Sequence, residues 1–251
     1  MIEGSDNPLQ EVVSVKSQKK DAEENIIEIK DLRKVYKVGN ETVVALNNIN
    51  ITIKKGEICC FLGTSGSGKS TLLNMMAGLE KPTKGTIKIA GWDVEKLSEK
   101  KLALFRQNHI GFIFQSYNLM TFSNALENVA MPLIFKGMGR KKRNKAAKEM
   151  LKAVGLEDRI NHRPSEMSGG QQQRVGIARA FVAKPEIVFA DEPTGNLDSK
   201  TSKDVMDMIV EMATQYNQTL IIVTHDLSVS KYAHRVFHIL DGDIDKIEVC
   251  S

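Results

Sequence analysis

The chain has 251 residues, of which 41% are hydrophobic and 26% charged, and its formal net charge is +4 at pH 7. This composition is typical of a globular protein that buries its core in one large domain or two interlocked lobes. So small a positive excess does not indicate nucleic-acid binding, and no nucleic-acid partner is expected. The apolar runs are too short to cross a bilayer and no signal peptide is visible, so we expect a cytoplasmic protein.

The three cysteines offer neither a disulfide framework nor a zinc site. Cys59 and Cys60 are adjacent within an apolar run, and Cys250 is the penultimate residue. Because their number is odd and their spacing is not that of metal ligands, we expect two small buried side chains and one loose thiol.

The first third of the chain changes character after a polar segment. Residues 1–25 are polar and charged and contain no aromatic residue, which predicts a flexible N-terminal extension. Residues 26–29 and 49–53 alternate as half-buried strands do, whereas residues 58–62 form a continuous apolar run that ends at a glycine. A helical pattern follows at residues 69–79.

The rest of the chain alternates helices with two further apolar runs. Helical patterns cover about 98–106 and 124–160, another follows Ser168, and one more lies near 200–215. The runs 187–190 and 220–223 predict buried strands. Buried strands that alternate with helices predict a parallel sheet covered on both faces. The helix-rich stretch of about 115–165 predicts an inserted lobe.

The most specific motif is the glycine-rich loop that follows the run 58–62. Its residues are Gly63, Thr64, Ser65, Gly66, Ser67, Gly68, Lys69 and Ser70, with Thr71 next, and they match the pattern G-x-x-x-x-G-K-S. The glycines let the backbone approach phosphates, and the amide groups with the helix N-terminus form an anion site. We expect Lys69 to reach the β- and γ-phosphates of ATP and Ser70 to bind Mg²⁺. The alternative, a glycine-rich turn that matches by chance, is disfavoured by the strand before the loop and the helix after it.

The apolar run 187–190 ends in two carboxylates, Asp191 and Glu192. In parallel α/β sheets ligands bind at the carboxyl ends of the strands, which places both acids beside the phosphate loop. Adjacent residues of an extended chain point in opposite directions, so we expect two roles. Asp191 would be an outer ligand of Mg²⁺, and Glu192 would polarise the attacking water. The alternative is a pair of acids that caps a strand at the turn before Pro193.

A second glycine loop precedes the helical pattern after residue 168. It consists of Ser168, Gly169, Gly170 and Gln171, and it repeats the combination of a hydroxyl, glycines and a helix N-terminus. Together with the two motifs above, it resembles the signature of the ATP-binding-cassette (ABC) ATPases. The resemblance covers about residues 26–245 and implies that this loop closes over ATP held by an opposing subunit.

Further members of this family's motif set follow in the expected order. The resemblance implies that Tyr36 stacks on adenine, that Gln115 touches Mg²⁺ and the attacking water, that Asp198 lies in a loop at the dimer interface, and that His225 senses the γ-phosphate. Taken singly, Tyr36 can also be ordinary strand packing, Gln115 a polar strand end and His225 a structural histidine.

The resemblance implies an α/β fold with the P-loop NTPase core of the ABC ATPases. Within residues 26–251 it implies a RecA-like lobe with a parallel sheet, an antiparallel β subdomain and an α-helical subdomain inserted at about 115–165. It also implies hydrolysis of ATP, with Mg²⁺ as cofactor, by a head-to-tail homodimer.

Residues around the signature narrow the resemblance to one branch. Residues 161–167, the three successive glutamines that follow Gly170, and residues 191–198 are similar to the lipoprotein-release, macrolide-export and antimicrobial-peptide-export group. This implies a separate integral-membrane permease that docks near Gln115 and residues 116–120. The ATPase would then lie on the inner face of the cell membrane as a peripheral subunit.

Other classes stay open at this point. A cell-division-type signalling ABC ATPase uses the same parts, and a soluble non-transport ABC ATPase would act in DNA repair or translation. The chain lacks the sustained heptads or repeated cassette that are usual in the latter. A nucleotide-binding interaction protein without turnover and a kinase are further alternatives. The basic run 136–148 could face anionic lipid headgroups or be a solvated helix face.

Overall fold

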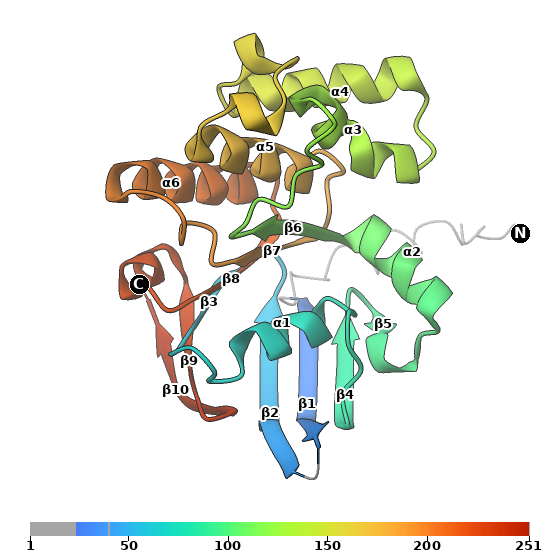
Figure 1. Cartoon of the computed structure of the whole chain (residues 1–251). Coiled ribbons are helices and arrows are strands. Elements are labelled where there is room, and N and C mark those ends of the chain that lie inside the picture. Colours follow the sequence, from blue (N-terminus) through green and yellow to red (C-terminus); the bar gives the residue numbers. More distant parts are fainter. Residues whose placement is uncertain (1–23, 40, 251) are drawn as a thin grey trace, which may run out of the picture.

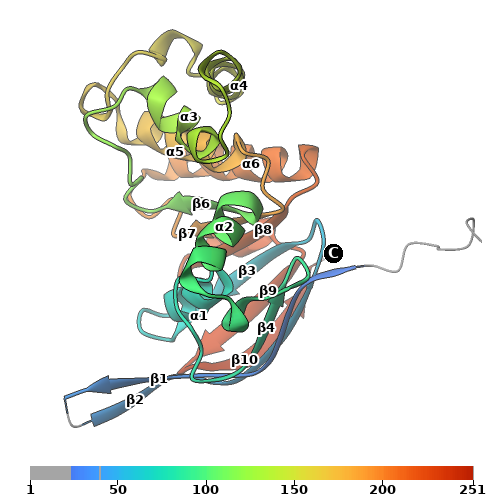
Figure 2. The same ribbon diagram turned by 90° about the vertical axis from the view of Figure 1, so that its right-hand side faces the viewer.

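The computed structural model describes residues 24–39 and 41–250. Two sheets and a group of helices build the fold, as Figures 1 and 2 show in two perpendicular views. The flexible extension predicted for residues 1–25 lies almost wholly outside the described residues, and Asn25 already begins the first strand.

The smaller sheet is antiparallel and has the strand order β2-β1-β4-β5. Its strands are β1 (Asn25–Val38), β2 (Glu41–Lys54), β4 (Lys84–Ile89) and β5 (Trp92–Asp93). The two alternating segments predicted as half-buried strands form parts of β1 and β2, which pair with each other. Their isoleucines turn inward and are buried, including Ile27, Ile29 and Ile51. The antiparallel β subdomain implied by the sequence is thus present.

The larger sheet has the order β10-β9-β3-β8-β7-β6. Its strands are β3 (Ile58–Leu62), β6 (Ile110–Phe114), β7 (Ile187–Asp191), β8 (Thr219–Thr224), β9 (Arg235–Leu240) and β10 (Asp243–Val249). All neighbours are parallel except the edge strand β10. Leu62 pairs with Thr224, Asp191 with Val223 and Phe114 with Asp191, so the carboxyl ends of β3, β8, β7 and β6 meet at one edge. Loops that leave this edge converge, as is usual for ligand sites in such sheets.

Both faces of the larger sheet are buried, as the continuous apolar runs predict. Along β3, Cys60 and Leu62 belong to one apolar core, whereas Cys59 and Phe61 belong to the other. The alternation follows from the strand period of two residues. Cys250, in contrast, is exposed.

Helices cover the two faces of the larger sheet. They are α1 (Lys69–Met76), α2 (Glu99–His109), α3 (Ala125–Phe135), α4 (Arg140–Ala153), α5 (Gly169–Phe181) and α6 (Ser199–Gln215). In the described part of the chain, 3-10 turns lie at Val94–Lys96, Glu157–Arg159, Pro164–Glu166 and Leu227–Tyr232. Helices α3, α4, α5 and α6 gather on one side of the sheet in Figure 1. None of the helices in the described ranges has the length and apolar character needed to cross a bilayer.

Two helix boundaries differ from the prediction for a physical reason. The helix expected at 69–79 ends at Met76, because Gly78 takes a positive φ of 64° that ends the helical hydrogen bonding. The pattern at 124–160 is divided between α3 and α4 at Gly137, whose φ is 72°. Beyond α4 the chain continues in short 3-10 turns.

Candidate active site

The phosphate loop joins β3 to α1 and presents a helix N-terminus to a cavity. Gly68, the N-cap residue of α1, has a φ of 91°. A Cβ atom at this position would lie 2.3 Å from the carbonyl oxygen of Ala45, so only glycine fits there. The backbone therefore has the conformation that lets successive N–H groups surround an anion.

Lys69 is buried beneath this loop, with 8% of its surface exposed. Its Nζ donates hydrogen bonds of 2.9 Å to the carbonyl oxygens of Gly63 and Thr64. No carboxylate of residues 24–39 or 41–250 forms an ion pair with it. The ammonium charge is therefore free to be balanced by an anion that enters the loop.

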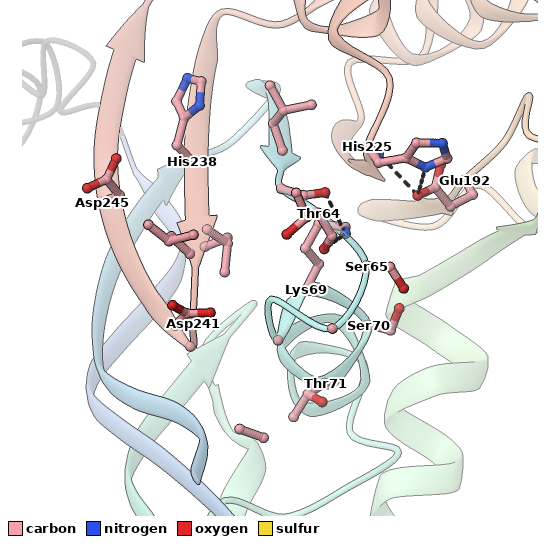
Figure 3. Close-up of a pocket in the computed structure, with 18 of the residues that line it drawn as sticks. Thr64, Ser65, Lys69, Ser70, Thr71, Glu192, His225, His238, Asp241 and Asp245 are labelled. Carbon is pink, nitrogen blue, oxygen red and sulfur yellow. Dashed lines mark hydrogen bonds and ion pairs between the residues drawn. The ribbon is translucent and has the colours of Figure 1, made fainter. Parts of the chain in front are cut away.

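A cavity of about 1120 Å³ lies over the loop. The predicted residues that line it are Gly63, Thr64, Ser65, Gly66, Gly68, Lys69, Ser70, Thr71, Gln115, Glu192 and His225. Figure 3 shows the loop between Glu192 and His225 on one side and the β9–β10 hairpin on the other. Ser67 belongs to the loop but does not line the cavity, because it is buried with 1% of its surface exposed. Segments far apart in the sequence thus converge on one site.

Asp191 ends β7 between the ends of two parallel neighbours, β6 and β8. Its Oδ1 is buried and has no hydrogen-bond partner among the described residues. Burial and then the negative charge of Glu192 raise the pKa of Asp191, whereas Lys69 opposes the rise. A buried carboxylate oxygen without a donor, close enough to Lys69 of the loop to be affected by its charge, fits a hard divalent cation such as Mg²⁺.

Glu192 follows Asp191 but leaves the line of the strand. Its φ of 44° is positive, so the backbone turns at this residue, and the strand alternation from which opposite directions were expected does not extend to it. The Oε1 atom accepts a 3.1 Å hydrogen bond from the backbone N–H of His225 and lies 2.8 Å from Nδ1 of the same residue. The Oε2 atom accepts a 2.9 Å hydrogen bond from the Thr224 hydroxyl. The carboxylate is therefore held at the rim of the cavity by the end of β8.

His225 is much more open than its partner. Its side chain is 66% exposed, against 18% for Glu192. The imidazole lines the cavity next to the phosphate loop (Figure 3). It can therefore reach a group that enters the cavity while it remains in contact with Glu192.

Gln115 directly follows β6 and is held by the loop after Glu192. The carbonyl oxygen of Gln115 accepts a 3.0 Å hydrogen bond from Nδ2 of Asn196, and its side-chain amide lies 3.4 Å from Oδ1 of Asn196. A Cβ atom on Gly195 would lie 2.7 Å from Nε2 of Gln115. The segment at the end of β6 and the loop that leads to α6 are thus packed directly together.

The signature loop lines a different cavity, of about 490 Å³. Ser168 caps α5 in a capping box: Gln171 N donates to the Ser168 hydroxyl, and Ser168 N donates to Oε1 of Gln171. Gly169 and Gly170 lie beside them in the lining, as does Asp198. Within the described residues, this lining shares no residue with that of the phosphate loop. One copy of the chain thus presents its two glycine-rich loops to two separate cavities.

Tyr36 and Asp198 have local partners in this structure. The Tyr36 hydroxyl donates a 2.6 Å hydrogen bond to Glu80. In β1, Tyr36 is paired with Val43 of β2, and Val43 lines the phosphate-loop cavity. Asp198 caps α6 by accepting hydrogen bonds from the backbone of Lys200 and Thr201. Adenine stacking and an interface contact therefore stay predictions for these two residues.

Sequence reasoning missed three residues that organise the site. Thr224 holds Glu192, Asn196 holds Gln115, and buried Gln173 of the signature helix donates through Nε2 to the carbonyl oxygen of Pro193. Each lies inside a segment that the motifs singled out. Their roles depend on pairings between distant segments, which a single sequence does not reveal.

A family model, related sequences and solved structures all show similarity to ABC transporter ATP-binding proteins. The family model described as "ABC transporter" matches residues 46–195. The ABC transporter ATP-binding protein MJ0796 of Methanocaldococcus jannaschii is 44% identical over 227 residues, covering 89% of this chain and 97% of that protein. A dimeric post-hydrolysis structure of the ATP-binding cassette MJ0796, bound to ADP and Pi, superposes with a TM-score of 0.83 at 42% identity. It covers 89% of this chain and 98% of that one.

A longer relative is also similar. The macrolide export ATP-binding/permease protein MacB of Vibrio parahaemolyticus is 43% identical over 219 residues. The match covers 87% of this chain but 33% of that protein.

Proposed function

Because the chain belongs to the ABC transporter family and has the fold of its ATP-binding cassettes, we propose that it powers a separate membrane permease. The permease would be of the lipoprotein-release or macrolide-export type, and its work would be export, extraction or peptide resistance. The observation that carries the proposal is the meeting of Lys69, Glu192 and His225 around one cavity.

In the proposed reaction the loop residues bind the nucleotide and the acids act on water. Lys69 exchanges its bonds to the loop carbonyls for bonds to the β- and γ-phosphates. Glu192 accepts a proton from the attacking water, while Thr224 and His225 hold its carboxylate. His225 donates toward the γ-phosphate, where negative charge has to be stabilised.

Mg²⁺ is proposed to be held by Ser70, Gln115 and Asp191. When bound it would neutralise charge on the phosphate oxygens. The orphaned, buried Oδ1 of Asp191 supports this assignment. The side chain of Gln115 lines the phosphate-loop cavity, as Ser70 does, and it can turn from Asn196 toward that cavity.

The active unit is proposed to be a head-to-tail homodimer. The two anion sites of one copy line different cavities, so Ser168 and Gly170 do not complete the site of their own chain. In a second copy facing the first, each signature loop would cover the other chain's nucleotide. The dimeric MJ0796 structures support this arrangement.

A groove of about 420 Å³ is the proposed docking place of the permease. It lies between α2, β6, α3 and α5 and is lined mainly by apolar residues, among them Phe112, Pro132 and Phe135. Phe135 is 68% exposed, and Phe122 in the segment after β6 is 73% exposed. An apolar groove that carries an exposed aromatic side chain, here Phe135, is typical of a protein-binding surface. The helical segment of about 115–165 would thus be the permease-contacting part of a nucleotide-binding domain that spans residues 26–251.

Docking there would place the chain on the inner face of the membrane. A cell-division-type signalling ABC ATPase or a soluble non-transport ABC ATPase would share the nucleotide site but differ in partner.

Two measurements on the purified chain test the proposal: phosphate release from Mg-ATP, and recovery of a membrane protein with the tagged chain from detergent extracts. Turnover with a copurifying permease supports it. Turnover without any membrane partner would favour the soluble class, and loss of copurification in Phe135→Ser would locate the contact.

A further inference from the structure

Helix α4 concentrates positive charge on one exposed face. It carries seven basic residues and one acidic residue, whereas the whole chain has a formal net charge of only +4. The exposed basic residues of its first three turns are Arg140, Lys141, Lys142, Lys145 and Lys148. Outside α4 the chain is therefore acidic on balance, and this helix is the centre of its positive field.

Few of the basic side chains of α4 are used for internal ion pairs, although Lys152, near the end of the helix, pairs with Glu157 at 3.2 Å. Among the described residues, Lys145 approaches Glu149 at 3.9 Å, with both side chains exposed, and Arg140, Lys141, Lys142 and Lys148 form no ion pair. Arg140, Lys141, Lys145 and Lys148 line one surface hollow. Their charges are therefore available to an external anionic partner.

The opposite face of α4 fixes the helix in place. Ala147, Met150 and Leu151 are buried in the core shared with α3 and α5. The turn before the helix is tied down as well, because Arg143 donates to the carbonyl oxygen of Met138 and Lys136 donates to that of Ala183. The basic face is thus held rigidly outward.

The basic face begins beside the proposed permease groove. Phe135 lines that groove, and its carbonyl oxygen accepts a 2.5 Å hydrogen bond from Gln107 of α2. Four residues lie between Phe135 and Arg140, which starts α4. In Figure 2 both α2 and the start of α4 face the viewer, so they lie on the same side of the molecule. A permease seated in the groove would bring its surrounding leaflet toward α4.

We infer that the exposed basic face of α4 binds the anionic phospholipid headgroups that surround the permease. This inference rests on the proposed function only for the orientation of the chain at the membrane. Lysine and arginine side chains near an anionic leaflet attract its phosphate groups, and the exposed Ile134 before α4 gives the apolar component usual at membrane surfaces. The contact would add to permease docking and fix the tilt of the ATPase under the membrane.

The test is cosedimentation of the full chain with lipid vesicles, without any permease. Phosphatidylcholine vesicles are compared with vesicles that also contain phosphatidylglycerol, each at low and high salt. The test variant changes Arg140, Lys141, Lys145 and Lys148 to Gln. The matched control changes Lys30, Lys55, Lys84 and Lys88, exposed lysines on or beside the antiparallel sheet, to Gln.

We expect salt-sensitive binding of the wild-type chain and of the control to the anionic vesicles only. The α4 variant should lose on the order of fivefold in partition constant for each charge removed. Replacing Lys141, Lys145 and Lys148 by Arg should preserve binding, which separates charge from folding. Equal binding to neutral vesicles, or anionic binding unchanged in the α4 variant, would overturn the inference. ATP hydrolysis is measured separately from vesicle binding. Absence of lipid binding would therefore leave the proposed ATPase function standing, and absence of hydrolysis would leave the lipid-binding result standing.

Discussion

Asn196 donates a hydrogen bond from its side-chain amide to the carbonyl oxygen of Gln115 at 3.0 Å. This bond joins the segment that follows β6 to the loop between Glu192 and α6. The first segment leads toward the proposed permease groove, and the second contains Asp198 in the lining of the signature cavity. The two segments are therefore in direct contact through this residue pair.

Replacing Asn196 by Ala tests this connection. Loss of one neutral hydrogen bond of about 1 kcal/mol should lower kcat about fivefold if the bond positions Gln115 in the reaction. The affinity for ATP, measured with a fluorescent analogue, should stay near the wild-type value because Asn196 does not line the nucleotide cavity. Lys203→Ala, which removes an exposed ion pair with Asp207 on α6, is the control. An unchanged kcat for Asn196→Ala would show that the bond has no catalytic consequence.

Glu192→Gln should separate ATP binding from hydrolysis. The amide keeps the shape of the carboxylate but cannot accept a proton, so we expect phosphate release to fall by roughly 10²–10⁴-fold. ATP should still bind, and the stalled chains should accumulate as dimers in size-exclusion chromatography. Undiminished turnover in this variant would remove Glu192 as the base.

Lys69→Ala should weaken nucleotide binding itself. The variant loses a charge-assisted interaction of about 1.5–3 kcal/mol with the phosphates, which corresponds to roughly 10- to 100-fold in Kd. Equilibrium binding of ATP without turnover measures this directly. Lys81→Ala, at an exposed lysine beyond α1, should bind ATP as the wild type does. Equal affinity in Lys69→Ala and wild type would contradict the proposed role of the loop.

Thr224→Val removes the hydroxyl that donates to Glu192 without a large change in shape. We expect kcat to fall by about fivefold, because one hydrogen bond to the carboxylate is lost, while the Kd for ATP stays the same. Thr224→Ser, which keeps the hydroxyl, should recover most of the rate. If Ser and Val at this position behave alike, the hydroxyl does not position Glu192.

The raised pKa of Asp191 predicts a pH effect on the stability of the nucleotide-free chain. A carboxyl group whose pKa is raised on folding binds more protons in the folded than in the unfolded state. Its contribution to stability is therefore lost as the pH rises from the unfolded pKa through the folded one. Asp191→Asn should thus increase the free energy of unfolding at neutral pH, and it should flatten this part of the pH dependence.

Urea unfolding of wild type and Asp191→Asn across the acidic to neutral range checks this expectation. The same variant should lose the stabilisation that Mg-ATP gives to the wild type, because the proposed cation ligand is gone. If Asp191→Asn is less stable than the wild type at neutral pH, the ionised carboxylate of Asp191 stabilises the folded chain, which would contradict this expectation.

The sequence predicted the local parts of the site well because their physics is local. The loop from Gly63 to Ser70 needs a strand before it, a helix after it and glycines at positive φ, and all three are visible in consecutive residues. The segment after Ser168 was likewise expected to begin a helix, and Ser168 is the N-cap residue of α5. The apolar runs also predicted the central strands and the burial of both sheet faces.

The remaining features depend on contacts between distant segments. The backbone turns at Glu192, and a hydrogen bond from the N–H of Glu192 to the carbonyl oxygen of Val223 in β8 fixes this turn. The bond of Asn196 to Gln115 joins positions 81 apart in the sequence. Neither residue type nor spacing indicates these pairings, so they became visible only in the structure.

A mixing experiment with two inactive variants tests most directly whether opposite chains complete each nucleotide site. One variant carries Lys69→Ala and keeps its signature, and the other carries Ser168→Arg and keeps its phosphate loop. A mixed dimer then contains one intact site, built from the loop of the second variant and the signature of the first. We predict that mixing restores phosphate release that neither variant has alone. A mixture no more active than its separate components would contradict a site shared between two copies.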